Sequence, residues 1–133
     1  MQNVNIQLKY FKEREFNNFG KMDIDFLKTL DEFRGFAGKP IIIHSDYRDN
    51  SERHKSGQAV DIRIVGFNVL DMYFLAEKFG KFKGIGLYPN WNNPGLHIDT
   101  FKSGRWLAYN SGTRQEYTAL NSENIKRYVL PII

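Results

Sequence analysis

The sequence predicts an α+β domain in which a small antiparallel sheet is covered by helices on one side. Two segments with helical spacing of apolar residues lie in the first two thirds of the chain, and several short strand-like segments follow. Runs of strands late in a chain favour an antiparallel sheet over repeated βαβ units. The length of 133 residues suits one hydrophobic core, so we expect one domain over residues 1–133.

The first helix is predicted over residues 22–37, where apolar side chains recur at helical spacing. Asp23 or Asp25 can cap its start, and Gly38 lies just past its end. Residues 41–43 are three isoleucines, whose β-branched side chains predict a short buried strand.

The middle of the chain predicts a loop, a strand and a second helix. Residues 44–57 are polar and rich in turn formers, which indicates a loop. Residues 58–65 alternate between apolar and polar side chains, which is typical of a strand with one buried face. The second helix is predicted over residues 68–79, with Asn68 as its N-cap and Gly80 just past its end.

The last part of the chain is dominated by strands. We predict them at residues 84–88, 96–101 and 106–109, and a short helix at residues 122–128. Together with the earlier elements, these strands complete the expected sheet.

The composition excludes several classes of protein. The chain has no cysteine, which rules out disulfide scaffolds, thiolate zinc fingers, iron–sulfur clusters and cysteine nucleophiles. The net charge is only +4 and is spread along the chain, so we expect neither a nucleic-acid nor a membrane partner. Residues 1–6 lack the basic and apolar regions of a secretory signal, so we expect synthesis in the cytoplasm without such a signal.

Two short patterns place metal-ligating residue types near one another. His54 precedes the strand at 58–65, which carries Asp61 on its polar face, and Gly57 lets the chain turn between them. In the strand at 96–101, the period of two puts His97 and Asp99 on the same face. Two imidazoles and a carboxylate are the three-ligand set of a catalytic zinc site, whose fourth position stays open.

These patterns allow a site in which one Zn²⁺ per chain is held by His54, Asp61 and His97. Isolated spacings of this kind also arise by chance, and such histidines are then ordinary solvated or hydrogen-bonded residues.

Five motifs follow one another along the chain in a fixed order. They are YFKEREF (10–16), PIIIHSDYR (40–48), HKSGQAVDI (54–62), GIGLYP (84–89) and LHIDT (96–100), with Arg105-Trp106 after the last. In this order they resemble the M15 zinc peptidases, the D-alanyl-D-alanine carboxypeptidase and peptidoglycan endopeptidase group, especially its short phage-type members. The resemblance implies that His54, Asp61 and His97 bind zinc and that Arg48 binds or orients the substrate.

The chain departs from the family pattern where a general base is expected. Many members have an acidic residue three positions before the second histidine ligand, and this position is Pro94 here. Asp99, on the same face as His97, is the nearest acidic replacement and our candidate for the general base. The alternative is that Asp99 orients an imidazole, as metal sites commonly require, and a catalytically impaired member is also open.

Other residues near the expected site have two interpretations each. His44 is expected to be structural, although it ends a strand beside the cleft. Tyr47, Tyr88 and Trp106 can line a groove for a peptide or sugar or simply fill the core. Residues 90–95 are rich in turn formers and are a candidate lip for the substrate.

The resemblance implies a zinc-dependent peptidase that hydrolyses a peptide bond in the peptidoglycan stem, as a D,D-carboxypeptidase or an endopeptidase. We expect a monomer that acts at the bacterial wall, as a phage lytic enzyme released by a holin or as a virion component. The first alternative is a non-catalytic metal-binding domain of the same fold, used for recognition or as a virion part. A metal-dependent nuclease and a nucleic-acid-binding module are further alternatives, because the pI is basic.

Overall fold

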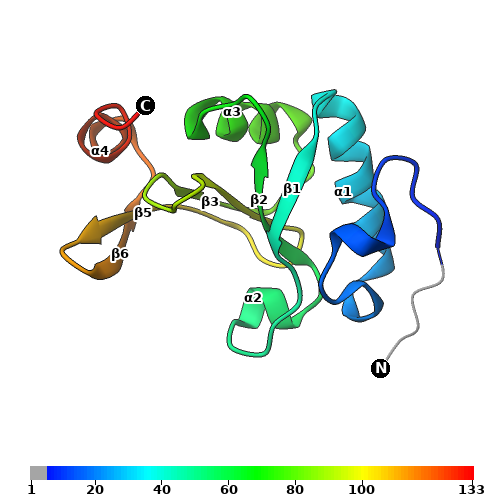
Figure 1. Ribbon diagram of the computed structural model, residues 1–133. Helices are drawn as coiled ribbons and strands as arrows, with labels where there is room; N and C mark the ends of the chain where they lie inside the picture. Colours follow the sequence, from blue (N-terminus) through cyan, green and yellow to red (C-terminus); the bar gives the residue numbers. More distant parts are fainter. Residues whose placement is uncertain (1–5) are drawn as a thin grey trace.

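In the part of the chain that the structure describes, residues 6–133, six strands form one sheet in the order β1-β2-β4-β3-β5-β6 (Figure 1). All neighbouring strands are antiparallel except β3 and β5, which run parallel. The strands are β1 (Ile41–Ser45), β2 (Ala59–Ile64), β3 (Gly84–Tyr88), β4 (Gly95–Asp99), β5 (Gly104–Ser111) and β6 (Arg114–Ala119).

Among the described residues, four α-helices and two short 3-10 helices pack around this sheet. α3 packs against β2, β3 and β4 and also contacts α1, whereas α2 packs against β2 and α4 against β5. The helices are η1 (Glu13–Glu15), η2 (Phe19–Lys21), α1 (Ile24–Ala37), α2 (Glu52–Lys55), α3 (Val69–Phe79) and α4 (Ser122–Tyr128).

This computed structural model describes residues 6–133 and confirms the predicted α+β class with its mostly antiparallel sheet. Residues 1–5, which belong to the predicted domain and to the segment without signal-peptide features, lie outside the described residues. Within the described part of the chain, no helix is long and apolar enough to cross a membrane.

The two long helices begin and end where their sequences indicate. The side chain of Asp23 accepts a hydrogen bond from a backbone N–H in the first turn of α1, and Asn68 does the same for α3. Gly38 and Gly80 follow the last helical residues with φ values of 64° and 76°, a left-handed conformation that glycine adopts without steric cost.

The two faces of β2 and β4 bury different kinds of side chain. One face is part of the hydrophobic core with α1 and α3, and the other carries Asp61 and His97, which are paired in the register of the two strands. The residues that point to the core from these strands are aliphatic and fully buried: Val60, Ile62, Leu96 and Ile98. The alternation predicted for both strands is confirmed. It places Asp61 and His97 together on the face of the sheet that lies away from the hydrophobic core, which we call the open face.

Two elements differ from the prediction. The predicted loop at 44–57 contains the single turn of α2, which the side chain of Ser51 caps and which is too short to show an apolar period. β6 is absent from the prediction because its residues are mostly exposed and polar; it pairs with β5 along its full length. The short helix predicted at 122–128 coincides with α4.

Candidate metal centre

Three side chains from separate elements converge on the open face of the sheet. His54 is carried by α2, Asp61 by β2 and His97 by β4. Asp61 Oδ1 lies 3.2 Å from His54 Nε2 and 3.2 Å from His97 Nδ1, and one ligand atom from each residue lies within 4.8 Å of the others. All three are buried, with exposed fractions of 1%, 6% and 3%. The structure therefore brings together the three residues predicted as metal ligands.

The turn between His54 and Asp61 depends on Gly57. Its φ of 75° is in the left-handed region, and a Cβ at this position would lie 2.8 Å from the backbone oxygen of Lys21 and 3.0 Å from the nitrogen of Asp23. A side chain would meet backbone atoms on two sides, and backbone cannot rotate away as a side chain can. Gly57 thus packs the turn against the start of α1 and holds α2 beside β2.

A backbone carbonyl orients the ring of His54. Its Nδ1 lies 2.7 Å from the carbonyl oxygen of Asp46, so Nδ1 carries the proton and donates it there. Nε2 then presents its lone pair on the side of Asp61; among the described residues it has no hydrogen-bond partner, although the ring is buried. The carboxylate of Asp46 accepts a hydrogen bond from the backbone N–H of Asn18, which fixes this segment in turn.

The ring of His97 is oriented the other way round by Asp99. His97 Nε2 lies 2.6 Å from Asp99 Oδ2 and donates its proton there, which leaves Nδ1 facing Asp61. Asp99 Oδ2 also accepts from Arg53 Nη1 at 2.7 Å, and Oδ1 accepts from the backbone N–H groups of Phe101 and Lys102. The two histidines therefore offer different ring nitrogens to the same point.

The position of Asp99 bears on its predicted role as general base. Asp99 is fully buried, bonds to the ring nitrogen of His97 that does not face Asp61, and is absent from the lining of the pocket described below. Both of its oxygens are already engaged as acceptors. This arrangement favours the alternative role, in which Asp99 orients the imidazole.

The electrostatics of the group match these contacts. Burial alone would raise the pKa of Asp61, but its close contacts with the imidazoles of His54 and His97 hold it well below its usual value. Burial acts to lower the pKa of His97, yet its contacts with Asp61 and Asp99 outweigh burial and raise it. Asp61 is therefore an anion close to two imidazoles, which is the charge state that a metal ligand requires.

The donor set fits a shared metal ion. Two ligand atoms bound to one tetrahedral zinc at ~2.0–2.1 Å lie about 3.3 Å apart, close to the 3.2 Å separations that involve Asp61 Oδ1. The unpartnered Nε2 of His54 is a buried polar atom that such an ion would satisfy. His54, Asp61 and His97 thus form a buried group that could hold a metal ion.

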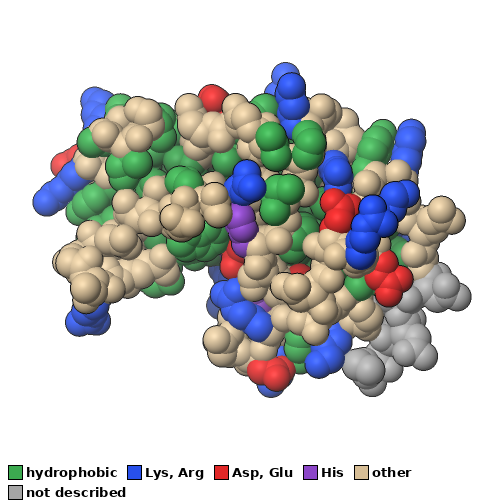
Figure 2. Space-filling view, in the orientation of Figure 1, with side chains coloured by type: hydrophobic (Ala, Val, Ile, Leu, Met, Phe, Trp, Pro, Cys, Tyr) green, Lys and Arg blue, Asp and Glu red, His purple; other side chains and the backbone are tan. Residues whose placement is uncertain are grey.

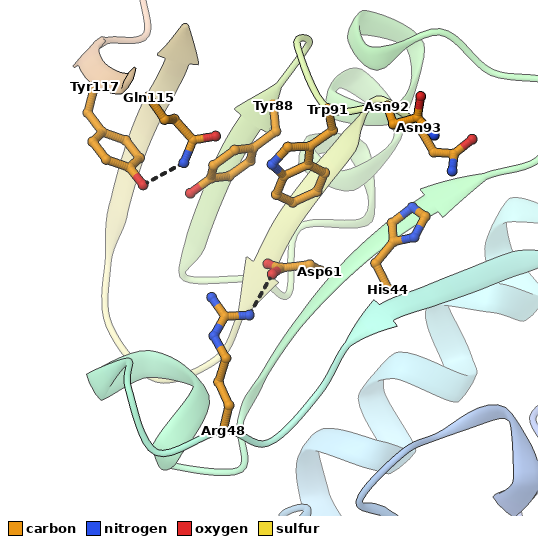
Figure 3. A pocket seen from close by; sticks show the side chains of 9 residues that line it. All are labelled: His44, Arg48, Asp61, Tyr88, Trp91, Asn92, Asn93, Gln115 and Tyr117. Atoms are coloured by element: carbon orange, nitrogen blue, oxygen red, sulfur yellow. Dashed lines mark hydrogen bonds and ion pairs between the residues drawn. The ribbon is translucent and has the colours of Figure 1, made fainter. Parts of the chain in front are cut away.

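A pocket of about 480 Å³ opens beside this group, with Asp61 in its lining (Figure 3). Arg48 lies next to Asp61: its Nη1 donates to Asp61 Oδ2 at 3.0 Å and to the hydroxyl of Ser45 at 2.6 Å. Figure 2 shows histidine side chains near the middle of this view, with basic side chains close to them. Arg48, predicted to contact substrate, is therefore placed at the pocket.

The aromatic residues considered in the sequence divide in the structure. Tyr88 and Trp91 line the pocket with their rings stacked 4.2 Å apart, so the predicted lip at 90–95 contributes to the wall. Trp106 instead packs 5.0 Å from the ring of His97 and donates its indole N–H to the hydroxyl of Tyr88. Tyr47 packs against the hydrophobic core and is absent from the pocket lining.

Three pocket residues were assigned differently or missed by sequence reasoning. His44, expected to be structural, lines the pocket. Gln115 and Tyr117 also line it, and they lie on β6, the strand that the sequence did not reveal. An alternating apolar and polar pattern was the signal that could have shown them, but the partly buried positions of β6 are Glu116 and Thr118, which are polar.

Comparison with known proteins yields no match: no protein family matches the sequence, and neither a curated protein nor a solved structure does. The resemblance to the M15 peptidases stays a prediction. The functional evidence in the structure is the geometry of His54, Asp61 and His97 beside the pocket.

Proposed function

We propose that the protein is a zinc-dependent peptidase that hydrolyses a peptide bond in the peptidoglycan stem. The observation that carries this proposal is the convergence of His54, Asp61 and His97 beside an open pocket. Two imidazoles and one carboxylate are the ligands of many zinc hydrolases and leave a position open for chemistry. The resemblance of the motif order to the M15 peptidases implies the substrate class.

Zinc bound by these three residues would supply Lewis-acid chemistry, polarising a carbonyl and lowering the pKa of water. The chain itself prepares the ligands: the carbonyl of Asp46 and the carboxylate of Asp99 hold the ring protons on the nitrogens that face away from Asp61. Such outer contacts fix both tautomer and ring direction.

Arg48 is the cation best placed to meet a substrate. Among hydrogen bonds within the described chain, the guanidinium uses only Nη1, and its side chain is 40% exposed. The remaining N–H groups form a planar donor set that suits a carbonyl or carboxylate oxygen. We expect Arg48 to orient the substrate while it also holds Asp61 in place.

One observation favours a second candidate, a metal-binding domain that recognises stem peptides without cutting them. Asp61 is the one carboxylate among the residues that line the described pocket, Asp99 is enclosed, and Pro94 cannot transfer a proton. A peptidase of this kind needs a group that takes a proton from water. The two candidates agree on the metal and on the ligand and differ in turnover.

A single set of measurements separates the candidates. The protein is purified, loaded with zinc, assayed for bound metal, and incubated with peptidoglycan whose fragments are identified by mass spectrometry. We expect one zinc per chain and stem-peptide cleavage that a chelator abolishes and added zinc restores. Zinc binding and stem-peptide binding without cleavage would support the recognition domain, and absence of zinc binding would overturn both candidates. Intact plasmid DNA after the same incubation would remove the nuclease.

A further inference from the structure

Arg63 lies on β2, two residues beyond Asp61. The side chains of Val60, Ile62 and Ile64 belong to the hydrophobic core. Because side chains alternate along a strand, Asp61 and Arg63 both lie on the open face. A strand advances ~3.4 Å per residue, so roughly 7 Å separate the Cα atoms of Asp61 and Arg63. Arg63 is therefore a neighbour of the candidate metal centre without being part of it.

The guanidinium of Arg63 forms no ion pair with the described residues. Its Nε is buried and has no hydrogen-bond partner there, although the residue as a whole is only partly buried. The other two arginines in strands, Arg105 and Arg114, each pair with a glutamate. Asp61 is already engaged by the two histidines and by Arg48. A buried charged donor is costly without an acceptor, so Arg63 calls for one from outside the chain.

A second buried atom without a partner belongs to the imidazole of His44. His44 lies on β1, next to β2, and its Nε2 has no hydrogen-bond partner among the described residues. Burial and the charge of Arg63 together lower the pKa of His44, which shows that the charge reaches this ring. The neutral ring can carry its proton on Nε2 and donate it. The close-up shows His44 on the side of Asp61 away from Arg48 (Figure 3).

A hollow of about 290 Å³ adjoins Arg63. Asn93 lines both this hollow and the pocket beside Asp61, so the two meet at this residue. The side-chain amide of Asn93 adds a further donor. Other parts of the lining are apolar, among them Val69 and Met72 of α3. Such surroundings suit a ligand group that has an aliphatic stem and a charged end.

The donors at this position specify the chemistry of that charged end. A guanidinium presents a planar fork of N–H groups that matches the two oxygens of a carboxylate. The imidazole of His44 and the amide of Asn93 add donors without adding charge. The proposed substrate is a peptide, and the anionic groups of an unmodified peptide are carboxylates. The expected ligand group is therefore a carboxylate, at a chain end or on a side chain.

We propose that Arg63, together with His44 and Asn93, forms an anion subsite that binds a carboxylate of the peptide ligand. This inference rests on the proposed function and adds a specificity determinant to it. An extended peptide also advances ~3.4 Å per residue, so the carboxylate belongs to a residue about two positions from the one at Asp61.

The test uses three forms of one stem peptide and calorimetric titration of the zinc-loaded protein. The first form has only its terminal carboxylate free, the second has only its side-chain carboxylates free, and in the third all are amidated. We expect Arg63→Gln to weaken binding of at least one carboxylate form by about 10- to 100-fold. Binding of the amidated form should change by less than about twofold, because a charge-assisted hydrogen bond is lost only where the carboxylate is present. The form that is affected identifies the source of the carboxylate.

The outcomes separate this inference from the proposed function. Equal weakening of all three forms by Arg63→Gln, or weakening of none, would overturn the anion subsite while cleavage of the peptide by the parent protein leaves the proposed function standing. If the parent protein neither binds nor cuts any form, both proposals are overturned.

Two further variants distinguish recognition from folding. Arg63→Lys keeps the charge but loses the planar fork, so we expect a smaller loss, confined to the same carboxylate form. Asn93→Ala changes an exposed residue and should weaken that form by about threefold. An equal loss for the amidated form in either variant would contradict the subsite, also if Arg63→Gln failed to fold.

Lys28→Gln is the matched control for the loss of one positive charge. Lys28 is exposed on α1, a helix that packs on the core side of the sheet, so its replacement is expected to leave all three affinities unchanged. A similar loss of affinity in Lys28→Gln and Arg63→Gln would assign the effect to net charge and overturn the inference.

Discussion

The two faces of β2 and β4 are almost equally buried, yet they differ in what their side chains require. Val60 and Leu96 point to the core with no exposed surface, while Asp61 and His97 on the other face are only 6% and 3% exposed. The core side chains need volume and contact. The polar side chains need partners, because a buried charge or donor without one is costly.

This difference teaches that burial alone does not separate core from site in a domain of this size. On the open face, each buried polar residue is held by a specific partner, such as the carbonyl of Asp46 for His54 or Arg53 for Asp99. Among His54, Asp61, His97 and Asp99, the buried side-chain atom without a hydrogen-bond partner is His54 Nε2, which faces Asp61. When the other polar atoms of a buried group are hydrogen-bonded, the one atom without a partner marks the position where a metal ion could bind.

The largest effects are expected from two neighbouring residues that point to opposite faces. His97→Ala should lower zinc affinity by more than about 100-fold and abolish the proposed peptidase activity, because it removes one of the three proposed metal ligands. Leu96→Ala should instead lower the free energy of unfolding by about 2–5 kcal/mol, while the folded protein keeps its zinc. Zinc titration and urea unfolding of both variants measure the two effects separately.

The expected division between the two faces would be contradicted if the losses of zinc affinity and of stability were exchanged between the two variants. Zinc loss in folded Leu96→Ala, or full zinc affinity in His97→Ala, would show that the two faces do not divide stability and chemistry in this way. Leu96→Ile serves as a control for the core position, since it keeps the volume and is expected to cost less than about 1.5 kcal/mol.

The next effect concerns a residue that belongs to the open face without facing the pocket. Asp99→Asn removes the negative charge and one of the two acceptor oxygens that hold the His97 ring and its neighbours, and we expect zinc affinity to fall by about 10- to 100-fold. Turnover at saturating zinc should be largely recovered, because Asp99 is enclosed behind the ring. A general base would give the opposite result: zinc affinity kept and turnover cut by ~10²-fold at any zinc concentration.

Folding of this variant needs its own check, because Asp99 also accepts from Arg53 and two backbone N–H groups. Arg53→Gln removes one of these bonds and leaves the carboxylate in place. We expect its zinc affinity to fall less than that of Asp99→Asn, which calorimetric zinc titration of the two variants can show.

The sequence predicted the three residues that could hold a metal ion because their positions follow local rules. A period of two places Asp61 and His97 on the polar faces of their strands, and a glycine turn precedes Asp61. The orienting contact from Asp46 to His54 could not be predicted, since the acceptor is a backbone carbonyl, which every residue has. The polar strand β6 was missed for a related reason: its pairing with β5 is made by backbone groups and leaves little trace in its side chains.

The smallest effect is expected for a partly exposed ion pair outside the open face, between Glu77 of α3 and Arg105 of β5. The guanidinium donates to both Glu77 oxygens, at 2.9 and 2.8 Å, and these hydrogen bonds hold the pKa of Glu77 below its ordinary value of 4.5. Because the pKa is lowered in the folded state, the stabilisation is present above pH 4.5 and is lost as the pH falls through the folded value.

Glu77→Gln should therefore lower the free energy of unfolding by less than about 1 kcal/mol at pH 7, since both side chains are about one third exposed. The difference in unfolding free energy from the parent protein should shrink below pH 4.5, where Glu77 becomes protonated, and in 1 M salt, which screens the ion pair. Urea unfolding at pH 7 and pH 3 measures it, with the exposed Glu13→Gln as control. A loss of stability that persisted unchanged at pH 3 would assign the effect to packing of the Glu77 side chain and not to its charge. The buried charges of the open face differ from this exposed pair, because their partners decide whether the site can form at all.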